Sequence, residues 1–507
     1  MNKYSNSRPN VLLFVTDQQR FDTLGCMGNS FVNTPNLDRL ASGGVLFERS
    51  YCQSPVCTPS RASFLTGRYP RTTRCRANGQ DMPPDERLIS RVLADNGYYC
   101  LLAGKLHLAP CGPSVCPIQE HRIDDGFIEF HWGHNPSGIG NAGHPEHGGT
   151  YWSGNRYSHW LFEQGQTYGS KNYDKMGYVK YGMDEDYHFT KWCADQAIHQ
   201  IRYHAAEKKA MPFYPSQPWF FNINTFDPHH AFDPPKRLLE KYLEIADKLP
   251  LPSYIDGEWL NKSVFQQIDH QHAYNITDPP HHFCFEEMCA DEHRMIKAAY
   301  YAMIENIDIQ LGRIVDALEE TGEIDNTIII FTSDHGEMLG DHGIYLKGPY
   351  CYEEMIHIPL IMYWKDHFKP AKVNALVELT DIVPTLEEFC IGKVESGVQG
   401  KSLADILTGE TSPEGHRDSI YCEYYECMPW HQNPKAYVTM AYDGRFKILR
   451  SHRSKEGELY DLLNDPHEFD NLWDRPEYAG EKIRMLELLT DRMADTVDPM
   501  PPIRDRW

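Results

Sequence analysis

A chain of 507 residues is long enough to bury a large core and carry a smaller second unit, so we expect two domains. The formal net charge of −23 argues against nucleic acid as a partner, because phosphate backbones are bound by basic surfaces. With 41% hydrophobic residues and no apolar run of bilayer-spanning length, the sequence predicts a globular protein without a membrane span.

The chain begins with a polar segment and lacks the apolar core of a secretory signal, so we expect a cytoplasmic protein. Its 14 cysteines are scattered without a C-x-x-C pair, and most are expected to be reduced core residues. Cys111 with Cys116, and Cys422 with Cys427, are close enough to suggest a disulfide or a metal pair, but no second ligand pair accompanies them.

Three continuous apolar runs, at residues 11–15, 219–224 and 328–331, have the length of strands that are buried on both faces. Asp17 follows the first run and Asp334 follows the third. Both carboxylates are therefore expected at the carboxyl ends of strands, where open α/β sheets bind ligands.

Helices are expected between these strands. Residues 299–320 carry apolar side chains at the spacing of one buried helical stripe, and Thr321-Gly322 ends the pattern. Strand and helix patterns alternate over the first 400 residues. This order predicts the α/β class, with a mostly parallel central sheet and helices on both of its faces.

Residues 112–190 interrupt the alternation, because they are rich in Gly, His and aromatic residues and show little periodicity. We interpret them as an insertion of ordered loops that shapes a substrate pocket, with Trp132, Trp152 and Tyr157 able to stack on sugar rings. The aromatic side chains could equally form a satellite core. Irregular spacing argues against a metal cluster for the histidines at 131, 134, 144, 147 and 159.

A second change of pattern near residue 410 divides the chain into a catalytic domain, 1–410, and a C-terminal domain, 411–507. In the latter, short runs at 436–440 and 446–449 flank the turn Asp443-Gly444 and predict an antiparallel hairpin. A terminal amphipathic helix is expected from Ile483, Leu486, Leu489 and Met493. The second domain is therefore a small antiparallel sheet with a helix.

The most informative segment is Cys57-Thr58-Pro59-Ser60-Arg61. Thr58 is a suitable helix N-cap and Pro59 a suitable first helical residue, so Cys57 would lie where unpaired N–H groups and the helix dipole attract an anion. A lone cysteine is more often a small buried hydrophobe. Together with Thr66-Gly67-Arg68, however, this segment resembles the C-x-P-S-R and T-G-R signature of the type I sulfatases.

The resemblance continues along nearly the whole chain and implies an alkaline-phosphatase-like fold. It also implies that a separate formylglycine-generating enzyme oxidises Cys57 to formylglycine, whose hydrate attacks sulfur. The further matching elements are 10–18, 33–38, 104–107, 228–229, 332–337, Lys347, 458–462 and 464–466.

The resemblance places a divalent metal ion at Asp17, Gln18, Asp334 and His335, with an oxygen of modified Cys57. Such oxygen-rich shells suit hard ions. Calcium is the expected metal, with magnesium and manganese as alternatives. Many relatives have aspartate at the position of Gln18 and asparagine at that of His335, whereas choline-sulfatase-like and phosphonate monoester hydrolase-like relatives share both residues.

Catalytic roles follow from the same resemblance. Arg61 would hold the hydrate, while Lys105 and Lys347 neutralise the sulfate oxygens. His229 or Lys347 would protonate the leaving alcohol, and His107 would deprotonate the remaining hydroxyl. Substrate-binding residues are expected to be Asn78, Lys105, His229 and Lys347.

The expected activity is hydrolysis of a sulfate ester, of a sulfated carbohydrate or a related small organosulfate. A phosphonate monoester hydrolase or phosphodiesterase is the alternative that Gln18 and His335 favour. Choline sulfate suits a chain without a signal sequence, whereas the aromatic insertion favours a larger ligand. A glycan-binding protein without activity is a third class, opposed by the filled catalytic positions. The oligomeric state stays open, with a homo-oligomer among the alternatives.

Overall fold

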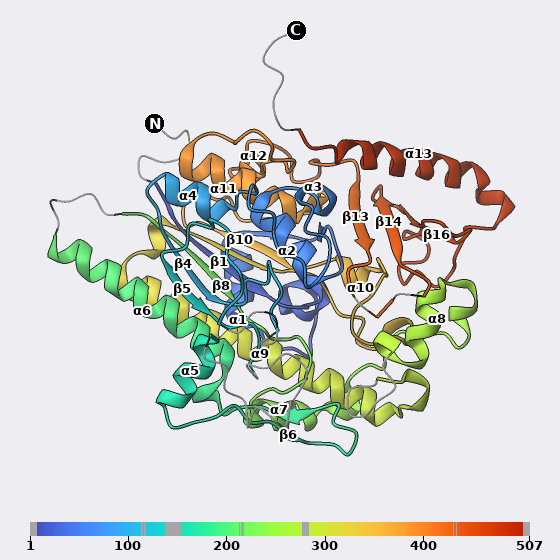
Figure 1. The fold of residues 1–507 in the computed structure, drawn as a ribbon, viewed down its shortest axis with the longest axis horizontal. Helices are drawn as coiled ribbons and strands as arrows, with labels where there is room; N and C mark the ends of the chain where they lie inside the picture. Colours follow the sequence, from blue (N-terminus) through green and yellow to red (C-terminus); the bar gives the residue numbers. More distant parts are fainter. Residues whose placement is uncertain are drawn as a thin grey trace, which may run out of the picture.

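The computed structural model describes residues 8–112, 115, 118–136, 154–211, 213, 217–275, 283–428, 430–431 and 433–499. Its centre is an eight-stranded sheet in the order β11-β2-β10-β9-β1-β8-β4-β5 (Figure 1). The strands are β1 Asn10–Thr16, β2 Val45–Phe47, β4 Tyr99–Gly104, β5 Glu129–Trp132, β8 Trp219–Asn224, β9 Thr327–Ser333, β10 Leu360–Tyr363 and β11 Ala371–Val373. Because β10 alone runs against its neighbours in this sheet, the predicted mostly parallel sheet is confirmed.

The three apolar runs of the sequence are the three middle strands of this sheet. β1 lies between β8 and β9, with Val15 opposite Asn224 on one side and Thr332 on the other. All residues of the three strands are buried. The shared register brings their carboxyl ends, and the polar residues that follow, to one edge of the sheet.

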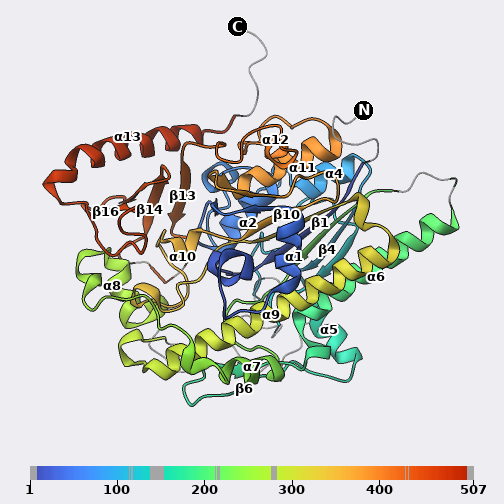
Figure 2. The same ribbon diagram turned by 180° about the vertical axis from the view of Figure 1, so that it is seen from behind.

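Helices cover both faces of the sheet (Figures 1 and 2). One face carries α1 Pro35–Gly43, α6 Phe189–Ala210 and α9 Ala290–Thr321, and the other α2 Cys57–Thr66, α4 Ile89–Asp95 and α11 Ile382–Ile391. Helix α9 ends as expected before Gly322 but begins before the predicted residue 299, at a capping box that Cys289 makes with Glu292. No helix among the described residues is both long and apolar enough to cross a membrane.

The segment 112–190 is more regular than its composition indicated. It supplies the edge strand β5 and the helix α5 Arg156–Glu163, and the short strands β6 Lys171–Asn172 and β7 Lys180–Tyr181 pair with each other. Trp132 and Tyr157 are fully buried, so the prediction that they stack on sugar rings is wrong. Both side chains belong to the hydrophobic core. Trp132 lies on β5, which pairs with β4, and Tyr157 packs against Phe189 and Trp192 of α6. Trp152, Cys116, His144 and His147 lie outside the described residues.

The C-terminal part contains a four-stranded antiparallel sheet of β13 Ile420–Tyr425, β14 Tyr437–Tyr442, β15 Phe446–Ser451 and β16 Gly457–Asp461. Helix α13 Ala479–Asp495 lies across it (Figure 1). The predicted hairpin and terminal helix are confirmed, although Ile483, expected on the buried stripe, is 58% exposed. Cys422 and Cys427 are free thiols. The domain boundary near residue 410 stays a prediction.

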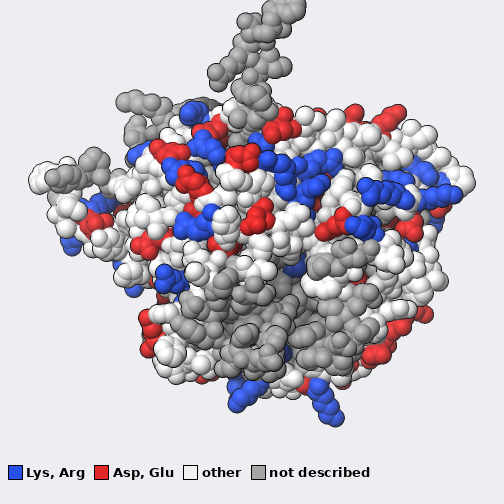
Figure 3. All heavy atoms as spheres, in the orientation of Figure 1, with Lys and Arg blue, Asp and Glu red and all other residues white. Residues whose placement is uncertain are grey.

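On the face seen in Figure 3, Lys and Arg of the described residues lie among Asp and Glu, with some Lys and Arg side chains gathered together.

Candidate active site

Cys57 is the first residue of α2, at the edge where the central strands end. The predicted N-cap, Thr58, is wrong, because the helix already begins at Cys57 and Val56 occupies the cap position. The N–H of Thr58 is instead satisfied by Oδ1 of Asn78, at 3.0 Å. Asn78 therefore supports the helix that carries Cys57, and its expected contact with substrate stays a prediction.

Residues that follow β1 and β9 meet at Cys57. Its Sγ lies 3.2 Å from Nε2 of His335 and 3.7 Å from Oδ1 of Asp17. Asp17, Cys57, Asp334 and His335 each offer one ligand atom, all within 4.8 Å of one another, and all four side chains are buried. Carboxylate oxygens with one imidazole nitrogen are a donor set that hard divalent ions accept, so this buried group fits a metal site.

Three of the hydrogen bonds of Gln18 fix it beside this group. Its N–H donates to Oδ1 of Asp334 at 3.0 Å, its Oε1 accepts from Nζ of Lys347 at 2.7 Å, and its Nε2 donates to Oε2 of Glu337. The amide oxygen is therefore the end of Gln18 that faces Lys347. The sequence motif contained Glu337 but gave no signal for this role.

Three buried cations surround the carboxylates. Arg61 donates from Nε to Oδ2 of Asp334 at 2.9 Å, and Lys105 forms an ion pair with Asp17. Nζ of Lys347 lies 3.1 Å from Sγ of Cys57. Burial raises the pKa of Asp17, but Lys105, Arg61 and Lys347 outweigh it and hold this pKa well below the usual range. The site thus provides positive charge within a strongly acidic chain.

Two of these cations, Lys105 and Lys347, also affect the pKa values of Cys57 and His229. Burial and Asp17 raise the pKa of the Cys57 thiol, but the opposite effect of Lys105, Lys347 and His335 is larger. The pKa of this thiol therefore lies below its ordinary value. Burial and Lys347 hold the pKa of His229 well below its usual range. Nε2 of His229 lies 2.9 Å from Nζ of Lys347, so the neutral imidazole accepts a hydrogen bond from the ammonium.

His107 is placed differently from the other predicted residues. Among the described residues, no hydrogen bond joins it to Cys57, and its ring packs edge-on against that of His134 with centroids 4.6 Å apart. The Glu120 carboxylate holds the backbone here, because it accepts the N–H groups of His107, Leu108 and Ala109. In the described part of the chain, no direct hydrogen bond between His107 and Cys57 supports the predicted catalytic role of His107, which stays a prediction.

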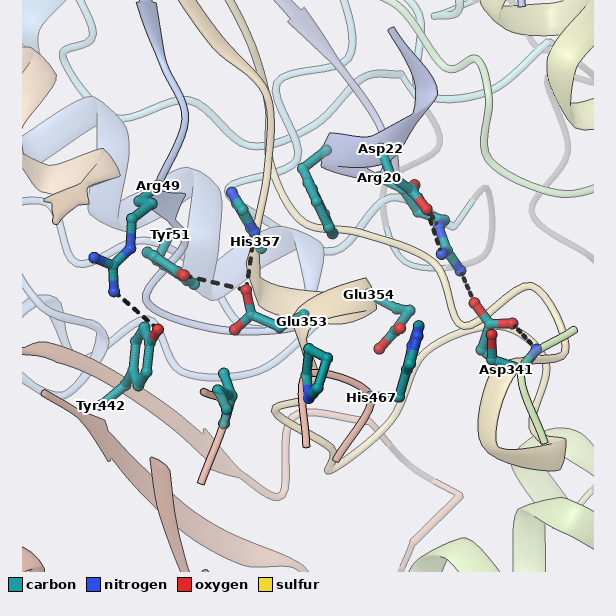
Figure 4. Close-up of a pocket in the computed structure, with 14 residues that line it drawn as sticks. Arg20, Asp22, Arg49, Tyr51, Asp341, Glu353, Glu354, His357, Tyr442 and His467 are labelled. Carbon is teal, nitrogen blue, oxygen red and sulfur yellow. Dashed lines mark hydrogen bonds and ion pairs between the residues drawn. The ribbon is translucent and has the colours of Figure 1, made fainter. Parts of the chain in front are cut away.

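A separate cavity of about 420 Å³ lies between α10 Glu353–Ile356 and the C-terminal sheet (Figure 4). On its wall, Glu353 accepts a hydrogen bond from Tyr51 at 3.1 Å and contacts His357 at 2.9 Å. Arg20 forms an ion pair with Asp341 at 2.6 Å. The residues that line this cavity do not include those that surround Cys57.

Comparison with known proteins agrees with this geometry. A family model described as "Sulfatase" matches residues 9–389, and one described as "N-sulphoglucosamine sulphohydrolase, C-terminal" matches residues 340–495. The chain belongs to the sulfatase family. It is thus a hydrolase of this family, within the alkaline phosphatase superfamily.

Relatives of this sulfatase-family chain include enzymes with different names. An arylsulfatase of Clostridium perfringens is 31% identical over 93% of this chain and 91% of its own length. The N-acetylglucosamine-6-O-sulfatase of Bacteroides thetaiotaomicron is 26% identical over 98% of this chain and 88% of its own length. The crystal structure of a phosphonate monoester hydrolase of Agrobacterium radiobacter superposes with a TM-score of 0.76 at 25% identity, covering 97% of both chains.

Proposed function

We propose that this sulfatase-family protein hydrolyses a sulfate ester, of a sulfated carbohydrate or a small organosulfate, with formylglycine at position 57 as the nucleophile. The observation that carries the proposal is the place of Cys57 at the start of α2, within 3.7 Å of Asp17, His335 and Lys347. The Sγ atom marks where the hydrate oxygens of the modified residue would lie. The arylsulfatase and the N-acetylglucosamine-6-O-sulfatase named above support a sulfate ester as substrate.

Asp17, Gln18, Asp334 and His335 would hold the metal ion, with calcium expected and magnesium or manganese as alternatives. A bound divalent ion would supply positive charge to the sulfate oxygens and favour the ionised form of a hydrate hydroxyl. The chain's own residues would do the rest of the work.

Arg61 would orient the hydrate, because two buried carboxylates fix its guanidinium, Asp334 at 2.9 Å and Asp17 at 3.5 Å. One hydroxyl would attack sulfur while Lys105 and Lys347 neutralise the sulfate oxygens. Lys347, which carries the proton shared with His229, would protonate the leaving alcohol oxygen.

Release of sulfate needs a base. In this proposal His107 takes the proton of the remaining hydroxyl, the carbon–oxygen bond to sulfate breaks, and the aldehyde is restored. Burial and Lys105 hold the pKa of His107 well below its usual range, so the imidazole is neutral and can accept that proton. Maturation would require a formylglycine-generating enzyme in the same compartment, which we propose to be the cytoplasm.

Mass spectrometry of the peptide that contains residue 57, from a preparation with measured turnover, tests the nucleophile. We expect formylglycine at this position and complete loss of activity in a folded Cys57→Ala variant. An unmodified thiol throughout an active preparation would contradict the proposal.

A phosphonate monoester hydrolase is the second candidate, because Gln18 and His335 are among the proposed metal ligands and a solved enzyme of that name shares the fold. Parallel assays on an aryl sulfate, sulfated sugars, choline sulfate and a phosphonate monoester separate the two. We expect the highest kcat/KM on a sulfated sugar. Faster cleavage of the phosphonate would support the second candidate.

A further inference from the structure

A second group of metal-ligating side chains lies beside the candidate active site. Among the described residues, two groups bring suitable ligand atoms together: the one around Cys57, and His107 with Cys111 and His134. In the second group the three ligand atoms all lie within 4.8 Å of one another. We propose that His107, Cys111 and His134 form an inhibitory site for a borderline divalent transition ion such as Zn²⁺.

The donor set determines this choice of ion. Two imidazoles and one thiolate suit zinc and cobalt, whereas calcium and magnesium require oxygen ligands. Three protein ligands leave a fourth position for water or an anion, as in open zinc sites. The carboxylate-rich group around Cys57 favours hard ions, so the two sites would select different metals.

Two buried nitrogen atoms are available to the ion. Nδ1 of His107 and Nδ1 of His134 are both buried and make no hydrogen bond within the described part of the chain. An unsatisfied buried polar atom is unfavourable, and a metal ligand bond would satisfy it. His107 is only 7% exposed. Burial and the nearby Lys105 hold the pKa of both rings low, so both are in the neutral form that binds metals.

Glu120 joins the two chain segments that carry the ligands. Its carboxylate accepts three successive N–H groups from 107–109 and, at 2.7 Å, the indole N–H of Trp132. Trp132 ends β5, two residues before His134. The same carboxylate lies 3.7 Å from Sγ of Cys111 and adds negative charge beside the proposed ion. The backbone of the site is thus held before metal arrives.

Closing the site requires small side-chain movements. Two nitrogen atoms and one sulfur atom on a tetrahedral zinc ion are separated by about 3.3–3.6 Å, which follows from the bond lengths. Because the three ligand atoms already lie within 4.8 Å of one another, each pair would approach by at most about 1.5 Å. Cys111 would lose its thiol proton to solvent on binding, so binding should strengthen as pH rises.

A bound ion would remove His107 from catalysis, because the metal would occupy the nitrogen lone pair that a base needs. This consequence rests on the role proposed for His107. The binding site itself does not depend on that role, so the two can be tested separately.

Binding is tested by titrating Co²⁺ into the full-length Cys57→Ala protein, which removes the thiol of the other group. We expect a thiolate-to-cobalt charge-transfer band that Zn²⁺ abolishes by displacement. The band should be lost in Cys57→Ala/Cys111→Ser, and the Co²⁺ affinity should fall about tenfold or more in Cys57→Ala/His134→Ala. The matched controls Cys57→Ala/Cys26→Ser and Cys57→Ala/His131→Ala should retain both.

Persistence of the band in the Cys111→Ser double variant, or its absence from the Cys57→Ala protein, would overturn the site. Anomalous diffraction from zinc-soaked Cys57→Ala crystals gives a second measurement that needs no ligand variant, with a peak expected between His107 and His134.

The inhibitory role is tested by activity. The formylglycine-containing Cys111→Ser enzyme should need at least about tenfold more Zn²⁺ for half-inhibition than the wild type. Equal zinc sensitivity would refute that role.

Discussion

At the scale of single residues, Glu337 decides how Gln18 is presented to the candidate metal site. Glu337 is fully buried, and its Oε1 accepts the N–H groups of Leu339 and Leu346 at 3.0 and 2.5 Å. Its other oxygen accepts from the Gln18 amide. Because a carboxylate only accepts hydrogen bonds, it orients the amide with the oxygen toward Lys347. Groups behind a metal ligand commonly tune affinity in this way.

Replacement of Glu337 by Gln should therefore weaken metal binding by about 10–100-fold, because the new amide can donate to Gln18 and permit the reversed orientation. Calorimetric titration of the metal-stripped variant measures this loss. Glu387→Gln is the matched control, since Glu387 is also a buried carboxylate that accepts a backbone N–H, from Glu395 at 2.9 Å. Equal affinities in the two variants would show that Glu337 has no positioning role.

At the scale of elements, α13 holds the C-terminal sheet to the helix that carries Cys57. Arg492 on α13 donates to Glu378 Oε1 at 2.8 Å and to the Tyr69 hydroxyl at 2.7 Å. Tyr69 lies three residues beyond the end of α2, and Glu378 ends the short strand β12 Val377–Glu378. Arg492 is 9% exposed, so this contact is shielded from water and salt.

We expect Arg492→Ala to lower the free energy of unfolding by about 3 kcal/mol, because it leaves a buried carboxylate with less compensation. Arg417, 3.4 Å from Glu378, remains as a cationic partner and limits the loss. Urea unfolding measures the difference. Arg484→Ala removes a cation of the same helix whose side chain is 49% exposed, and should change stability by less than about 1 kcal/mol. A similar loss in both variants would contradict the role of Arg492.

At the scale of the whole molecule, the large core forces some acids into surroundings that disfavour their charge. Burial raises the pKa of Asp233 to about 7, although a hydrogen bond from Tyr168 opposes the shift. The unfolded chain would ionise this group near pH 4. The folded state therefore binds the proton more tightly, and this contribution to stability is lost as pH rises through about 7.

Asp233→Asn should remove this loss while keeping an acceptor for Tyr168. Between pH 5 and pH 8 the free energy of unfolding of the wild type should fall by on the order of 3 kcal/mol more than that of the variant, which is the contribution of the ionisation of Asp233. Urea unfolding at the two pH values measures the difference. The exposed Asp247→Asn should behave as wild type. A parallel pH dependence in Asp233→Asn and wild type would show that Asp233 does not carry the effect.

The sequence by itself determined three adjacent strands of the central sheet and the centre of the candidate site. Apolar runs identified β1, β8 and β9, because strands buried on both faces need continuous apolar residues. Since parallel strands end at one edge, the positions of Asp17 and Asp334 directly after two such runs were enough to place them together. The residues around Cys57 carried the family resemblance without any tertiary information.

Only the tertiary structure decided which distant side chains support these residues. Asn78, twenty residues from Thr58, accepts the backbone N–H of Thr58 in the first turn of α2, and Glu337 orients Gln18 from beyond the end of the neighbouring strand β9. Trp132, one of the residues predicted to stack on sugar rings, is buried and donates its indole N–H to Glu120. Local sequence patterns encode the period and ends of an element, whereas these contacts depend on register and packing between elements far apart in the chain. The association of His107 with His134 has the same origin, because the two histidines lie beyond the ends of neighbouring strands, β4 and β5.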